Sequence, residues 1–136
     1  MFYDQSGYPL RFEWGEAAIQ YLAPPYQAMV IIGVLSFSTA VDVALERGVS
    51  VLLYRWKDDS AACHAAEQGA VLASHDRRSI CGYSLSPASL STLPQGARLA
   101  LPSPNGATLS VLAHQSGAAV FTACFRNASV VAAYIE

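Results

Sequence analysis

Short aliphatic runs alternate with helix-length segments along this chain. Residues 28–35 and 50–54 are nearly continuous in Val, Ile and Leu, which is typical of strands in a parallel sheet that helices cover on both faces. Between them, residues 39–47 place four apolar residues on one helical face: Ala40, Val41, Ala44 and Leu45. The pattern predicts an α/β fold, with three α/β/α layers around a mostly parallel or mixed sheet.

Turn and cap residues mark the boundaries of these elements. Thr39 with Asp42 resembles a capping box, and Gly48 stands where a left-handed C-terminal cap belongs. The polar residues 74–93 predict a loop with one helical turn after Pro87. The other expected elements are an edge strand at 10–14, helices at 15–21, 58–68, 105–115 and 127–135, and strands at 70–73, 98–101 and 118–123.

Composition adds an expectation about the surface. A length of 136 residues predicts a single domain over residues 1–136, and 53% hydrophobic residues are enough for a well-filled core. Only 13% of the residues are charged, against about 25% in an average globular domain. We therefore expect part of the surface to be covered by another subunit, so that the protein forms a homo-oligomer.

Charge and cysteine usage exclude several classes of partner. The net charge is −2 and the eight Lys and Arg residues are scattered, which argues against a nucleic-acid partner. The longest apolar run is well short of the roughly 20 residues that cross a bilayer, and no basic segment leads into an apolar run at the N-terminus. We expect a cytoplasmic protein with no membrane partner, in which three unevenly spaced cysteines stay reduced.

Polar residues gather where three expected strands lead into helices. The carboxyl ends of parallel strands share one edge of a sheet, and free N–H groups at helix starts attract anions there. The third junction adds a guanidinium, which can hold two oxygens of a phosphate or carboxylate. The sequence therefore predicts a pocket for a small anionic, phosphorylated molecule. Its candidate residues are Ser36, Ser38 and Thr39 at the first junction, Ser103, Asn105 and Gly106 at the second, and Arg126 and Asn127 at the third.

Helix capping explains any one of these junctions equally well, because Ser, Thr and Asn are the common N-cap residues. The chain contains neither a Gly-x-Gly-x-x-Gly fingerprint nor a Walker Lys-Ser/Thr loop, which argues against a nucleotide. None of the junctions contains Asp or Glu, the residues whose oxygens magnesium prefers. The residues by themselves therefore indicate no metal site.

No catalytic residue is assigned, but two candidates follow from the residues. His75 lies in the polar loop beside Asp76 and could act as an acid or base. Cys124 ends an apolar run near Arg126, so a reactive thiol is an alternative to a buried hydrophobe. The remaining His and Trp residues are expected to be structural: His64 and His114 at helix surfaces, and Trp14 and Trp56 in the core or an interface.

Four segments in the same order resemble those of a known family. Residues 31–41 read Ile-Ile-Gly-Val-Leu-Ser-Phe-Ser-Thr-Ala-Val, 84–87 read Ser-Leu-Ser-Pro, 101–107 read Leu-Pro-Ser-Pro-Asn-Gly-Ala and 126–129 read Arg-Asn-Ala-Ser. With Arg-Phe-Glu-Trp-Gly at 11–15, they resemble the 2-phosphosulfolactate phosphatase, or ComB-like, family. Gly33 stands where that family usually has Asp.

The resemblance implies a magnesium-dependent phosphatase that hydrolyses a small phosphomonoester such as (R)-2-phospho-3-sulfolactate. It also adds Ser86 to the substrate-binding residues. Magnesium is implied by the family alone, because this chain offers no identified ligand for it. The alternative hypothesis is a shortened, catalytically inactive relative that binds an anion or associates with itself.

Overall fold

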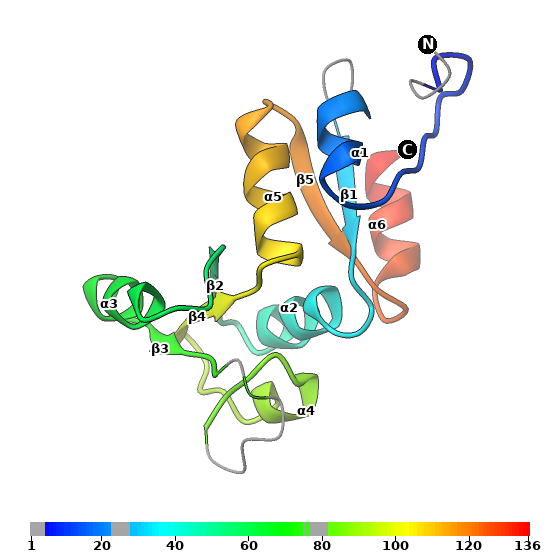
Figure 1. Cartoon of the computed structure of the whole chain (residues 1–136). Helices are drawn as coiled ribbons and strands as arrows, with labels where there is room; N and C mark the ends of the chain where they lie inside the picture. Colours follow the sequence, from blue (N-terminus) through cyan, green and yellow to red (C-terminus); the bar gives the residue numbers. More distant parts are fainter. Residues whose placement is uncertain (1–4, 23–27, 75, 77–81) are drawn as a thin grey trace.

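The computed structural model describes residues 5–22, 28–74, 76 and 82–136. No helix in this described part is long and apolar enough to span a bilayer. The elements alternate as the sequence predicts (Figure 1): α1 (Gly15–Leu22), β1 (Ala28–Ile32), α2 (Phe37–Glu46), β2 (Ser50–Tyr54), α3 (Ser60–Glu67), β3 (Val71–Leu72), α4 (Pro87–Leu90), β4 (Arg98–Pro102), α5 (Gly106–Gln115), β5 (Ala119–Ala123) and α6 (Ala128–Ile135).

Every strand pairing in the described residues is parallel, which confirms the α/β fold. β1 pairs with β5 from Ala28 opposite Ala119 to Ile32 opposite Ala123. β4 pairs with both β2 and β3, so these three strands form a second sheet in the order β2-β4-β3. The strands are thus divided between two sheets, where the sequence pattern predicted one.

Helices α2 and α5 connect the two sheets. Each contacts β1, β5 and β2, and the two helices also contact each other. α5 and α6 lie on opposite sides of the β1–β5 pair (Figure 1), while α3 packs on β3 and β4. Helices therefore flank the parallel strands, and α2 and α5 are positioned to bring their N-terminal ends close together.

The core gathers around α2, α4 and the three-stranded sheet. Its fully buried large side chains come from the loop after α2, from α4 and its following turn, and from β4: Val49, Leu90, Leu93, Leu99 and Leu101. Burying such side chains contributes about 1.5–3 kcal/mol each. On α2, Ala40, Val41 and Ala44 are buried as predicted, but Leu45 is exposed because its position turns away from that face.

Helix α2 begins three residues earlier than the capping-box prediction, with Thr39 as N-cap residue, placed it. Ser36 is the N-cap residue, and Phe37 begins the helix with its ring buried against the start of α5. Thr39 lies within the first turn, where its hydroxyl donates to the carbonyl of Val34 at 2.8 Å. The capping-box prediction was therefore wrong, whereas the left-handed backbone of Gly48, at φ +70°, is confirmed.

The expected edge strand at residues 10–14 does not form. The side-chain amide of Gln5 donates to the carbonyl of Phe12 at 2.6 Å and accepts from its N–H at 2.9 Å. These local bonds occupy the backbone groups that a strand ladder would need. Residues 9–14, hereafter the strap, carry Trp14 at 77% exposure, and Trp56 is also half-exposed. Neither tryptophan is a core residue.

Helix α6 covers one side of β5 but buries none of its own residues in the described structure. Tyr134 reaches the ring of Phe121 at a centroid distance of 5.5 Å. Val130 and Tyr134 are otherwise largely exposed, and the helix has no charged residue in its first or last turn. α6 thus presents an apolar face to the surroundings.

The contact between Phe37 and Gly106 yields a stability prediction. A Cβ atom at Gly106 would lie 2.1 Å from Cγ of Phe37, so Gly106→Ala forces the ring or α5 to move. Overpacking of this kind costs roughly 1–3 kcal/mol, which urea unfolding would measure. Gly7→Ala is the matched control, since nothing lies within 4 Å of its Cβ position. Equal unfolding midpoints for the two variants would contradict the prediction.

Candidate functional site

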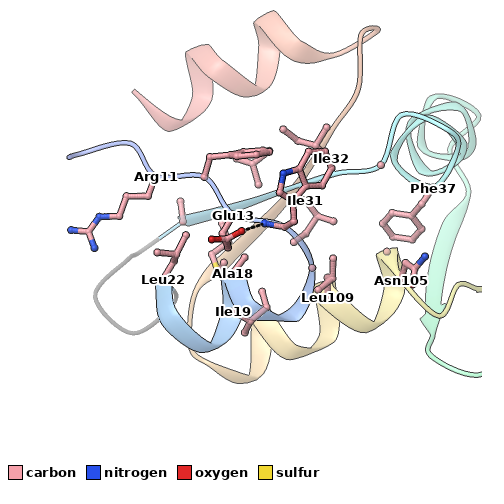
Figure 2. A pocket seen from close by; sticks show the side chains of 18 of the residues that line it. Arg11, Glu13, Ala18, Ile19, Leu22, Ile31, Ile32, Phe37, Asn105 and Leu109 are labelled. Carbon is pink, nitrogen blue, oxygen red and sulfur yellow. Dashed lines mark hydrogen bonds between the residues drawn. The ribbon is translucent and has the colours of Figure 1, made fainter. Parts of the chain in front are cut away.

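A groove of about 580 Å³ runs between β1, α1 and the strap. Figure 2 shows Ala18, Ile19 and Leu22 of α1 beside β1, with Glu13 of the strap close to Ala18 and the guanidinium of Arg11 pointing away from them. Leu109 of α5 also lines the groove. Its volume lies within the range of about 300–1,000 Å³ that is typical of small-molecule sites.

One end of the groove is polar and brings together two of the three predicted junctions. Gly33 and Ser36 come from the turn between β1 and α2, while Ser103, Asn105 and Gly106 come from the turn between β4 and α5. Phe37 packs against Gly106 at this end, so the starts of α2 and α5 are in direct contact. Residues more than 60 positions apart in the sequence therefore share one site.

At the first junction, the hydroxyl groups bond the protein's own backbone. Ser36 Oγ donates to the carbonyl of Leu85 at 2.6 Å. Ser38 Oγ donates to the carbonyl of Ile31 at 3.0 Å and accepts the N–H of Gly33 at 2.8 Å. Since Thr39 also donates to a backbone carbonyl, all three hydroxyl protons are already used. The local role of these side chains is to fix the turn after β1.

The second junction leaves one side chain available to a ligand. Ser103 Oγ accepts the N–H of Gly106 at 3.2 Å, which closes the turn before α5. Asn105 is the N-cap residue, but its exposed side chain makes no hydrogen bond within the described structure. Asn105 can therefore offer both an N–H donor and a carbonyl acceptor to a molecule in the groove.

Ser86 lies one residue from the groove rather than in its lining. Its neighbour Leu85 lines the groove and accepts the hydroxyl proton of Ser36. The N–H of Ser86 donates to Ser84 Oγ at 3.1 Å, and its carbonyl accepts the hydroxyl of Ser89 at 2.8 Å. The Ser-Leu-Ser-Pro segment thus supports the turn that faces the first junction.

The third predicted junction lies outside the groove lining. Arg126 donates from Nε to Asp42 at 2.8 Å and from a terminal nitrogen to Glu46, both on the outer side of α2. The pKa of Arg126 is raised above its ordinary value. The largest cause is the hydrogen bond with Asp42, and the next is the negative charge of Glu46. Its guanidinium is therefore paired with carboxylates instead of facing the polar end of the groove.

Asn127 has a structural role as the N-cap residue of α6. Its Oδ1 accepts the N–H of Cys124 at 2.8 Å, and its Nδ2 donates to the carbonyl of Thr122 at 3.1 Å. Both bonds hold the turn between β5 and α6. The side chain is thus already paired on both of its polar atoms.

The described residues do not fit the magnesium ion that the family resemblance implies. No group of three or more His, Cys, Asp or Glu side chains in this part of the chain could hold a metal. Glu13 is the carboxylate in the groove lining, and it accepts the N–H of Trp14 at 2.8 Å. Asp42 and Glu46 bind Arg126. The single carboxylate that the described residues contribute to the groove lining is too few for the oxygen ligands that magnesium prefers.

The histidines and the candidate thiol Cys124 lie away from the groove lining or outside the described residues. His64 stacks on Tyr54 at a centroid distance of 4.5 Å, and His114 lies near the C-terminal end of α5. Cys124 is buried as a free thiol. His75 lies outside the described residues. None of the described members of this group lines the groove.

Sequence reasoning missed the apolar part of the groove. Leu10, Phe12 and Trp14 alternate with charged residues in the segment where the sequence predicts an edge strand. All five residues of this segment line the groove, the charged Arg11 and Glu13 included, and the rings of Phe12 and Trp14 contact each other edge to face at 5.4 Å. The large apolar residues of the segment were the signal available in the sequence, but their alternation with charged residues does not separate a groove face from a solvent face.

Comparison with protein-family models, with curated proteins and with solved structures finds no match for this chain.

The role of Ser38 can be tested by removing its hydroxyl. Ser38→Ala leaves the half-buried N–H of Gly33 and the buried carbonyl of Ile31 without their side-chain partner, and we expect a loss of about 1–3 kcal/mol in the free energy of unfolding. Ser129→Ala, at an exposed position of α6, is the matched control and should change stability little. Chemical denaturation of both variants provides the comparison, and equal stability would show that the Ser38 bonds contribute nothing.

Proposed function

We propose that this protein binds a small organic anion at the polar end of the groove and acts as a binding module. The observation that carries the proposal is the meeting of the α2 and α5 starts at Phe37 and Gly106. Helix starts expose N–H groups without intrahelical partners, and their dipoles favour negative charge. The unpaired amide of Asn105 adds a side-chain donor at the same place.

The residues of the groove support binding better than magnesium-dependent hydrolysis. Gly33, which stands where the resembled phosphatase family usually has Asp, brings no carboxylate to this end. A Cβ atom at Gly33 would lie 3.3 Å from Cβ of Phe37 and 3.6 Å from the backbone nitrogen of Ser38, so the turn is closely packed. Within the proposal, the chain is a relative of the 2-phosphosulfolactate phosphatase family that keeps an anion site without the metal.

Asn105→Ala tests the proposal with inorganic phosphate as the probe. Loss of a hydrogen bond to a charged ligand costs about 1.5–3 kcal/mol, so the Kd for phosphate should rise about tenfold or more. Titration followed by amide chemical shifts would measure it, with the largest shifts expected at Phe37 and Gly106. Gln115→Ala, at the opposite end of the same helix, is the matched control and should bind phosphate like the unchanged protein.

Two results would contradict this proposal. Phosphate-induced shifts centred on Arg126 and Asn127 would move the anion site to the third junction. Release of phosphate from phenyl phosphate that depends on added magnesium chloride and is lost in Asn105→Ala would identify an enzyme instead of a binding module.

A second candidate function is self-association through α6. The helix buries none of its residues in the described structure, and Val130 and Tyr134 leave about three quarters of their surface exposed. Monomeric proteins rarely expose contiguous apolar patches of large area, and such patches mark interaction sites. The low fraction of charged residues agrees with a surface that a second copy covers.

Val130→Lys should weaken this association, because it would place an unpaired charge in the contact. We expect the dimer dissociation constant to rise tenfold or more, as measured by light scattering over a dilution series. Ala62→Lys, which adds the same charge at an exposed position of α3, should leave association unchanged. A monomer at all concentrations of the unchanged protein would rule out this function.

A further inference from the structure

Large apolar side chains line the groove beyond its polar end, and they remain exposed to solvent. Leu35 is 90% exposed and Trp14 is 77% exposed, although both belong to the lining. The others of this kind are Leu10, Phe12, Ile32 and Ile135. They come from the strap, from β1 and the turn after it, and from α6, so three separate parts of the fold contribute to one apolar surface.

We propose that the ligand of this groove is amphipathic: an anionic head, such as a phosphate monoester or carboxylate, attached to a hydrocarbon body of several carbons. This inference rests on the proposed function, which supplies the site for the head. A phosphate alone would occupy only the polar end of a groove of about 580 Å³. The apolar lining would then stay in contact with water, whereas a hydrocarbon body would remove it from water.

Among the described residues, the groove lining carries one acidic and one basic side chain, Glu13 and Arg11, so it has no net charge that would favour a second acidic group on the ligand. Glu13 lies beside β1 near Ala18, whereas Asn105 lies beyond Leu109 at the other end (Figure 2). A second acidic group at the Glu13 end would be repelled by the Glu13 carboxylate, and Arg11 is the basic residue of the lining that could offset that repulsion. A neutral hydrocarbon body meets no such penalty, and it can contact Ile31, Ile32 and the edge-to-face pair of Phe12 and Trp14.

The two tryptophans of the chain allow a direct test. Trp14 lines the groove, while Trp56 lies outside the lining with the guanidinium of Arg55 at 5.0 Å from its ring. In Trp56→Phe, fluorescence reports on Trp14 alone. We expect hexyl phosphate to shift the emission of Trp14 to shorter wavelength and to bind at least tenfold more tightly than inorganic phosphate, since each buried CH₂ is worth about 0.8 kcal/mol.

Matched variants distinguish the contribution of the hydrocarbon body to binding from that of the anionic head. Ile32→Thr changes an exposed residue of the lining, so it should weaken hexyl phosphate about threefold or more and leave inorganic phosphate unchanged. Leu45→Thr changes a comparably exposed residue of α2 outside the lining and should affect neither probe. Trp14→Phe keeps an aromatic ring in the groove, and its remaining tryptophan should show no shift with hexyl phosphate.

The outcomes distinguish this inference from the proposed function. Binding of inorganic phosphate with no gain for hexyl phosphate would overturn the amphipathic ligand and leave the anion site standing. Equal binding of hexyl phosphate and the neutral 1-hexanol would support the apolar part of the groove and overturn the anion site. Absence of binding by all three probes would overturn both.

Discussion

The contact between Phe37 and Gly106 determines how the rest of the site is arranged. The ring of Phe37 fills the space that a side chain at position 106 would need, so α2 and α5 meet at their first residues. These helices follow strands of different sheets, and each contacts both sheets. A close helix–helix contact therefore joins the β1–β5 pair to the three-stranded sheet and creates the polar end of the groove.

Most of the polar residues near this contact stabilise turns. Ser36 and Ser38 donate to backbone carbonyls, Ser103 accepts the N–H of Gly106, and Asn127 bonds the backbone at the end of β5. Buried backbone groups need partners, and short hydroxyl and amide side chains provide them where no ladder or helix does. Asn105 differs because it is exposed and holds no such bond in the described part of the chain. This difference makes it the best placed of the candidate side chains to contact a ligand.

The distribution of apolar surface is the second feature that organises the molecule. The core around Leu90, Leu99 and Leu101 is fully buried, but the strap and α6 leave large side chains in contact with water. Exposed apolar area carries a free-energy cost that a ligand or a second copy can relieve. The strap lines a groove of ligand size, whereas α6 presents a convex helix surface. The groove suits a small molecule, whereas the surface of α6 suits contact with another protein.

The sequence by itself determined the order of strands and helices, because continuous aliphatic runs and helical spacing are local signals. It predicted the bounds of β2 and α5 to within one residue and the left-handed backbone at Gly48. It also identified the first two junctions as polar helix starts. The tertiary structure alone decided which junctions meet, since that depends on contacts such as Phe37 with Gly106 across some 70 residues. It likewise decided that Arg126 pairs with Asp42 and Glu46, and that residues 10–14 line a groove. Periodicity records that one face of a segment is apolar, but only the folded chain supplies what that face contacts.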